Sequence, residues 1–514
     1  MKYRKKGEIR LAKKKNTGMT RFLNGVERIG NKLPDPFILF IALAALVAVA
    51  SWVISLFDVT FVVPGDESEE LAIKSLLSTE GIQYILSDTL NNFVGFAPLG
   101  IVLTMMLGIG LADKVGLIET GIKSTILKAP KSLVTYAIVL TGILGNIASD
   151  AAFVIIPPLA AMVFYNLGRH PLAGLAAGFA GVGAGFTSNL IVTGTDALLA
   201  GISTEAIRTV NENISVTPVD NWYFMMACTF ILTFVGGFIT EKIVEPRLGK
   251  YEGSAGEEVK EATSLEIKGL RNSIIACVIF VALLVIAILI PNSPLTGEDG
   301  SIVPSPFLTG IVPILLLLFV VAGVTYGVTV GKIKSSRDVG SFMGESMKDM
   351  SGFIVLVFAA SQFIAYFSWT NMGAWIAISG AEFLQSIGMT GIIVILAFVL
   401  FTAILNLFVF SGSAQWALEA PIFVPMFYYL GYSPAFVQAA YRIADSSTNV
   451  ITPMNPYMII VLGFVRQYDK KAGLGTIIAL MLPYTIFFLI TFTIMLLIFY
   501  FTGIPFGPGV DVNV

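Results

Sequence analysis

Four charged or amide side chains stand in otherwise apolar stretches of this sequence: Asp196, Asn406, Arg442 and Asp445. Charge is costly in a hydrocarbon environment, so an ionisable residue there is a functional candidate. Arg442 and Asp445 lie three positions apart and would share one face of a helix. An internal ion pair between them is therefore one alternative to a binding role. For Asp196 the alternative is a cap near a surface loop.

Two hydroxyl-rich motifs built around an asparagine add oxygen atoms to this set. One contains Ser188 and Asn189, and the other contains Thr448 and Asn449. Such side-chain oxygens, together with carbonyls freed where a helix breaks, suit a hard cation such as Na⁺. The sequence therefore indicates a Na⁺ site that involves Asn189, Asn406 and Asn449.

Each asparagine motif follows one copy of a duplicated segment. Residues 158–171 return as residues 421–434, with Pro, Phe, Tyr, Leu, Gly and Pro in the same register. A duplicated hydrophobic segment with Pro and Gly interruptions points to the binding site of a transporter. We expect the Pro-Gly breaks to be the tips of re-entrant hairpins. Irregular backbone at membrane depth must be buried in protein or line a cavity.

The composition is that of a membrane protein. Of the 514 residues, 55% are hydrophobic and 13% are charged, whereas a soluble protein has roughly 25% charged residues. Long apolar runs cover residues 36–57, 93–111, 222–239, 274–290, 307–330 and 475–501. Each is close to the ~20 residues that span a bilayer as a helix. Backbone groups in lipid must pair within the segment, so we predict an all-α integral membrane protein.

Several classes of chemistry are disfavoured by the residue inventory. Cys228 and Cys277 are the only cysteines, and His170 is the only histidine. A disulfide framework, a Cys- or His-based metal site and a Ser-His-Asp triad are therefore not expected. The P-loop motif is missing, which excludes ATP as a direct energy source through such a loop. We expect no enzyme activity and no cofactor, and keep a membrane hydrolase and an ion channel as the alternatives from other classes.

Basic residues predict the orientation of the chain. Residues 1–34 contain eleven Lys or Arg and two acidic residues, and the tail after Phe501 has no base. The positive-inside rule therefore puts the amino terminus in the cytoplasm and the carboxyl terminus outside, with an odd number of crossings. An acidic loop near Glu205 follows the first copy and a basic loop near Lys470 follows the second. The two copies should therefore be inverted relative to each other, as in alternating-access transporters.

The same features divide the chain into six segments. They are a basic cytoplasmic arm (1–34), scaffold and oligomerisation helices (35–131), a first core repeat with its hairpin (132–221), scaffold helices with a cytoplasmic loop (222–349), a second core repeat with its hairpin (350–474), and a final transmembrane helix with an outer tail (475–514). We expect the basic arm to meet anionic membrane lipid and not nucleic acid.

Residues 22–501 resemble the p-aminobenzoyl-glutamate transporter (AbgT-type) family of bacterial membrane proteins. The motifs that carry the resemblance are Gly183-Ala-Gly-Phe-Thr-Ser-Asn189 with Gly194-Thr-Asp196, Asn406 with Ser413-Ala-Gln-Trp416, and Tyr441-Arg-Ile-Ala-Asp445-Ser-Ser-Thr-Asn449-Val-Ile-Thr-Pro453. This resemblance implies a bowl-shaped homodimer in the cell membrane, with nine transmembrane helices and two re-entrant hairpins per subunit. It also implies uptake of p-aminobenzoyl-glutamate or export of sulfonamide antimetabolites.

The family's functional positions fall on six residues of this chain: Asp196, Asn406, Trp416, Pro434, Arg442 and Asp445. The resemblance thus implies a substrate site of Trp416, Arg442, Asn406 and Pro434. Ion coupling would fall to Asp196 and Asp445, with Ser188, Asn189, Thr448 and Asn449.

The borrowed roles fit the chemistry of the side chains. The planar guanidinium of Arg442 suits a glutamate-type carboxylate, and Trp416 could cover an aminobenzoyl ring, although a tryptophan is more often a packing residue. The driving ion would be Na⁺ or H⁺. The runner-up within the transporter class is a sodium-coupled carrier of dicarboxylates or short-chain fatty acids.

Overall fold

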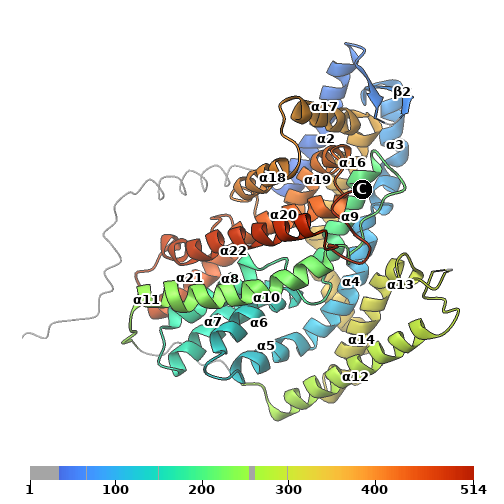
Figure 1. The fold of residues 1–514 in the computed structure, drawn as a ribbon. Coiled ribbons are helices and arrows are strands. Elements are labelled where there is room, and N and C mark those ends of the chain that lie inside the picture. Colours follow the sequence, from blue (N-terminus) through green and yellow to red (C-terminus); the bar gives the residue numbers. More distant parts are fainter. Residues whose placement is uncertain (1–33, 65, 149, 254–260, 298) are drawn as a thin grey trace, which may run out of the picture.

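The computed structural model describes residues 34–64, 66–148, 150–253, 261–297 and 299–514 (Figure 1). The predicted basic arm, apart from Pro34, lies outside these described residues. Helices dominate the described part of the chain, which confirms the predicted fold class. Among the described residues, seven helical segments are long and apolar enough to cross a membrane.

These seven segments are α2 (Pro36–Ser55), α3 with α4 (Thr79–Val94 and Ala97–Lys114), α10 with η2 and α11 (Trp222–Ile239, Thr240–Val244 and Glu245–Leu248), α12 (Ser264–Leu289), α14 (Ile311–Thr329), α16 (Ser351–Trp369) and α22 (Leu474–Thr502). Shorter peripheral helices are α5 (Leu117–Leu127), α13 (Pro306–Thr309), α15 (Ser336–Asp349) and α17 (Met372–Ser386). The described chain also contains an antiparallel strand pair that the all-α prediction omits, β1 (Thr60–Val63) with β2 (Asp66–Ala72).

The two repeats are built from shorter helices. The first contains α6 (Val134–Leu144), η1 (Gly145–Ala148), α7 (Asp150–Asn166), α8 (Pro171–Ala184) and α9 (Gly194–Arg208). The second contains α18 (Ile392–Leu405), α19 (Gly412–Tyr429), α20 (Pro434–Thr448) and α21 (Tyr457–Tyr468). In each repeat two helices form a hairpin and the next two form an interrupted crossing. The seven long segments and these two interrupted ones are the candidates for the nine predicted crossings.

The duplicated sequence pattern ends one helix and begins the next in both repeats. Gly168 and Gly431 have φ angles of +72° and +90°, a region that glycine adopts without a steric cost. In each turn the amide after the glycine donates to the Phe carbonyl of the shared Phe-Tyr-x-Leu-Gly sequence, at 2.8 Å and 2.9 Å. This bond is typical of a Schellman cap. The shared proline, Pro171 or Pro434, is the first residue of the following helix, where its missing N–H costs nothing.

The predicted position of the hairpin tips is therefore wrong. The Pro-Gly turns connect the hairpin to the interrupted crossing, whereas the hairpin tips are the loops between α6 and α7 and between α18 and α19. Glycine and proline were a misleading signal for the tips because the cap and the helix start already require both residues.

The two repeats are inverted, as predicted. Helices α10 and α22 lie side by side and run antiparallel, since Phe224 N donates to Phe506 O at one end and Arg247 Nη1 donates to Ala479 O at the other (Figure 1). The first turn lies at the Arg247 end, because its residue Arg169 forms an ion pair of 2.5 Å with Glu245. The second turn lies at the Phe506 end, where the amide of its N-cap serine donates to a carbonyl of the carboxyl-terminal tail.

The remaining long helices pack around this core. Helix α12 contacts α14, α14 contacts α4, and α2 contacts α16. Only 6% of the most apolar stretch of α12 is buried within the chain. This helix therefore offers its apolar surface to lipid or to another subunit. The division into scaffold and core segments and the homodimer stay predictions.

Candidate functional site

The loop that interrupts the crossing of the first repeat, between α8 and α9, contacts helix α20 of the second repeat. Thr187 lies between α8 and α9, and its amide donates to the Ser446 hydroxyl of α20 at 3.2 Å. The two hydroxyl groups are 2.6 Å apart and share a further hydrogen bond. The polar residues singled out by the sequence gather around this contact, so the two repeats build one site.

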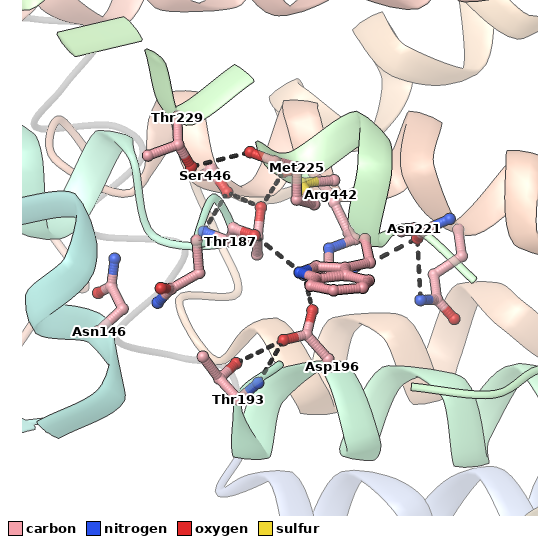
Figure 2. Close-up of polar contacts among 12 residues, drawn as sticks. Asn146, Thr187, Thr193, Asp196, Asn221, Met225, Thr229, Arg442 and Ser446 are labelled. Atoms are coloured by element: carbon pink, nitrogen blue, oxygen red, sulfur yellow. Dashed lines mark hydrogen bonds and ion pairs between the residues drawn. The ribbon is translucent and has the colours of Figure 1, made fainter. Parts of the chain in front are cut away.

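Arg442 occupies the centre of the contact and is 1% exposed. Its guanidinium forms an ion pair with Asp196 Oδ1 and donates to Thr187 O at 2.9 Å and to Asn221 Oδ1 at 3.5 Å (Figure 2). The alternative of a local ion pair between Arg442 and Asp445 is therefore wrong. Its sequence basis was spacing alone, and the partner comes instead from the other repeat.

Asp196 forms the cap that the sequence offered as an alternative and also an ion pair with Arg442, and its role in ion coupling stays a prediction. One carboxylate oxygen, Oδ2, accepts from the amide of Thr193 at 2.6 Å and from its hydroxyl at 2.8 Å. This contact caps the start of α9, a position where a negative charge also interacts favourably with the helix dipole. The other oxygen faces Arg442. Asp196 thus ties the cap of one repeat to the cation of the other.

Four predicted residues come together where the end of α18 meets the carboxyl-terminal half of α20. Asn406 Nδ2 donates to Asp445 O at 2.7 Å, to Thr448 Oγ1 at 2.8 Å and to Asn449 Oδ1 at 3.1 Å. Asn406 Oδ1 and Asp445 Oδ1 are buried without a hydrogen-bond partner. Unpartnered buried oxygens carry a desolvation cost, and they are the kind of atom that a hard cation would bind.

A smaller counterpart of this cluster exists in the first repeat. Asn146 follows α6 as Asn406 follows α18, and its Nδ2 donates to the carbonyl of Gly185 at 3.4 Å. Asn146 Oδ1 and Ser188 Oγ are buried without a partner. Asn189 belongs to this half, and no hydrogen bond among the described residues joins it to Asn406. The predicted set of three asparagines is therefore divided between the two clusters.

Trp416 is buried and packs on Tyr441, with ring centroids 4.5 Å apart. Its indole N–H donates to Ser203 Oγ at 3.0 Å, and Ser203 Oγ donates to Gln438 Oε1 at 2.6 Å. Gln438 Nε2 in turn donates to Asn221 Oδ1 at 3.1 Å. Because Asn221 also contacts Arg442, hydrogen bonds link the predicted aromatic and carboxylate contacts of the substrate.

Pro434 is buried as the first residue of α20. Its observed part in the structure is to start the helix that carries Arg442 and Asp445. A direct contact between Pro434 and substrate stays a prediction.

Sequence reasoning missed several buried polar residues at this site. Glu419 is 2% exposed in α19, and it was detectable as a lone carboxylate between Trp416 and the repeated Pro421. Asn221 and Gln438 gave no such signal, because an amide near a helix end has many ordinary explanations.

The inverted repeats, with interrupted crossings that meet at buried charges, define a membrane transporter and not an enzyme. The family described as "AbgT putative transporter family" matches residues 21–514. The chain belongs to the AbgT family.

Individual relatives agree with this assignment. The chain is 43% identical over 486 residues to the p-aminobenzoyl-glutamate transport protein of Escherichia coli (strain K12), covering 94% of this chain and 96% of that protein. Among solved structures, the YdaH transporter of Alcanivorax borkumensis matches with a TM-score of 0.88 and 37% identity, over 92% of this chain and 100% of that chain. MtrF of Neisseria gonorrhoeae, whose structure is described as representing a class of antimetabolite efflux pumps, matches with a TM-score of 0.90 and 44% identity. The match covers 95% of this chain and 100% of that chain.

Proposed function

We propose that this protein is an ion-gradient-driven secondary transporter of p-aminobenzoyl-glutamate or a related aromatic carboxylate, with sulfonamide-type antimetabolites as further substrates. The name of the Escherichia coli relative supports the first substrate, and the description of MtrF supports the second. The observation that carries the proposal is the buried guanidinium of Arg442 between the two interrupted crossings.

Arg442 has an unused donor for an anionic substrate. Its Nε–H is buried without a hydrogen-bond partner, whereas Nη2 is engaged by Asp196 and Thr187. A substrate carboxylate would bind Nε and compete with Asp196 for the neighbouring nitrogen, since one guanidinium edge accommodates one bidentate carboxylate. Binding would thereby loosen the contact between the two repeats.

Trp416 is placed to serve the aromatic part of the substrate. Its indole packs on Tyr441, and an aminobenzoyl ring would stack in the same region when the two side chains separate. The hydrogen-bonded path through Ser203, Gln438 and Asn221 supports this assignment, because it makes the positions of Trp416 and Arg442 interdependent.

The two clusters of unpartnered oxygens supply the coupling. In the second repeat Asp445, Asn406, Thr448 and Asn449 would bind Na⁺, or Asp445 would carry H⁺. In the first repeat Ser188 and its neighbouring asparagines offer only neutral oxygens, which suit Na⁺ and not a proton. A cation that binds between the breaks would favour the conformation in which substrate is held.

The decisive experiment uses purified protein in liposomes. Uptake of radiolabelled p-aminobenzoyl-glutamate is measured with Na⁺ and pH gradients imposed separately, and counterflow is measured without any gradient. We expect counterflow that excess unlabelled p-aminobenzoyl-glutamate inhibits and that a dicarboxylate does not. Counterflow of a dicarboxylate alone would refute the proposed substrate class.

A further inference from the structure

Glu419 is a buried carboxyl group that no role assigned above uses. It lies in α19, and its side chain accepts from Thr402 Oγ1 at 2.6 Å and from Gln415 Nε2 at 2.8 Å. Both donors are neutral. Within the described chain, no Lys, Arg or His side chain forms an ion pair with Glu419.

An ionised carboxylate in this position would be strongly penalised. Removing such a charge from water carries a large free-energy penalty unless a cation offsets it. Arg442 of α20 is already paired with Asp196. The acid form avoids this cost. A hydroxyl accepts as well as it donates, so Thr402 Oγ1 would take the carboxylic O–H in the geometry that is present.

The ionisable groups on every helix packed against α19 give Glu419 no free positive partner. Helix α20 contributes the neutral Tyr441, the guanidinium of Arg442 that is paired with Asp196, and Asp445, which repels Glu419 when both carboxyls are ionised. The remaining groups are Asp196 paired with Arg442, Glu205 paired with Arg208, the exposed Glu382 of α17 and Tyr366 of α16. Helix α18 contributes none. Glu419 and Asp445 therefore form a two-carboxyl group without a free cation.

The first repeat shows that the fold does not need a carboxyl at this position. In the alignment of residues 158–171 with 421–434, Glu419 corresponds to Ile156 and Gln415 corresponds to Ala152. Ile156 is fully buried in the equivalent helix. An apolar side chain thus packs well at this position. Burying a carboxyl group there instead costs free energy, which indicates that Glu419 has a role other than packing.

We propose that Glu419 is a proton-binding residue of the transport cycle and carries its proton in this conformation. When α19 moves away from α18, the carboxylic acid loses Thr402 as a partner and releases H⁺ to water on one side. The carboxylate then takes up H⁺ from the other side as the contact re-forms. This inference rests on the proposed transport function, and it places a proton site at Glu419 in addition to the cluster of Asn406 and Asp445.

The first test reads protonation directly and needs no substrate. Infrared difference spectra of the purified protein across a pH titration should contain the C=O band of a buried carboxylic acid. We expect the band to disappear in Glu419→Gln and to remain in Asp445→Asn. Persistence of the same band in Glu419→Gln would overturn the proposal.

The second test separates coupling from binding. Glu419→Gln has the shape of the protonated acid, so counterflow should continue at the wild-type rate while uptake driven by a pH gradient is lost. Glu382→Gln on the exposed side of α17 is the matched control and should keep both activities. Loss of counterflow as well in Glu419→Gln would indicate a structural role, and full pH-driven uptake would show that another group carries the proton. If wild-type counterflow is missing, the proposed substrate fails, and the infrared result still decides the protonation of Glu419.

Discussion

Asp196 of the first repeat and Arg442 of the second form a buried ion pair across the interface of the two repeats. Asp196 is also held within the first repeat by the cap of α9. Arg442 donates a further hydrogen bond to the carbonyl of Thr187, which also belongs to the first repeat. A movement of α9 relative to α20 must therefore break this ion pair, whereas a joint movement of the two helices would preserve it. The pair is a natural point at which a bound anion could shift the balance between two conformations.

Removal of one partner should destabilise the protein more than removal of both. Asp196→Asn leaves the buried guanidinium of Arg442 without a counter-charge, for which we expect a loss of about 3–5 kcal/mol. Arg442→Gln in the same chain should recover part of that loss, because no uncompensated charge remains. Thermal unfolding of the single and double variants in detergent measures the difference. Additive losses would show that the two side chains are energetically independent.

Asp445→Asn should abolish gradient-driven transport while the protein still inserts into the membrane. Asp445 Oδ1 is buried without a partner, and the backbone carbonyl of Asp445 is joined through Asn406 to Thr448 and Asn449. The substitution removes the formal negative charge that Asp445 brings to this cluster. Uptake in liposomes with an imposed gradient measures the effect, and size-exclusion chromatography verifies assembly. Normal driven uptake would make Asp445 a structural residue.

Gly412→Ala should impair transport by displacing the same carboxylate. A Cβ atom at Gly412 would lie 2.9 Å from Asp445 Oδ2 and 3.2 Å from Oδ1, so the carboxylate must move. The matched control is Gly463→Ala in α21, where an added Cβ meets nothing within 4 Å. We expect driven uptake to fall in the first variant and not in the second, with similar expression of both. Equal uptake would mean that the position of the Asp445 carboxylate is unimportant.

Cysteine labelling should place the loops after the two repeats on opposite sides of the membrane. The probes are Ser215→Cys and Gln467→Cys, both at exposed positions, in a background without Cys228 and Cys277. A membrane-impermeant maleimide should reach Ser215→Cys from outside and Gln467→Cys only after permeabilisation. Labelling of both from one side is incompatible with the inverted arrangement.

Asp220 in the loop before α10 should make stability pH-dependent. Burial raises the pKa of Asp220 to about 6, although hydrogen bonds from Thr217 act in the opposite direction. A carboxyl whose pKa is higher in the folded state stabilises the protein at low pH, and that stabilisation is lost as the pH rises through 6. The Tm of Asp220→Asn relative to wild type should therefore increase between about pH 4 and about pH 7.5. Asp511→Asn, at an exposed position, is the matched control for the loss of a carboxyl group.

The sequence predicted the helical membrane fold and the inversion because both depend on signals of local composition. Apolar length specifies a span, and the charges of the loops after each copy specify its direction. Spacing could not identify the ion-pair partner of Arg442, because it offered the nearby Asp445 only as an alternative and the actual partner is the distant Asp196. A pairing across repeats depends on how α9 packs on α20, which no spacing within either segment encodes. Glu419 was overlooked for a different reason, since its neighbours Thr402 and Gln415 acquire meaning only when α18 and α19 are placed together.

The opposite positions of the Gly168 and Gly431 turns also restrict how such a chain can evolve. Loops between the duplicated segments can lengthen or shorten freely, but the loss of one intervening span would turn the second copy over. Arg442 would then be carried away from Asp196, and no single later substitution would bring it back. Spans in this lineage can therefore be gained or lost between the two copies only in pairs.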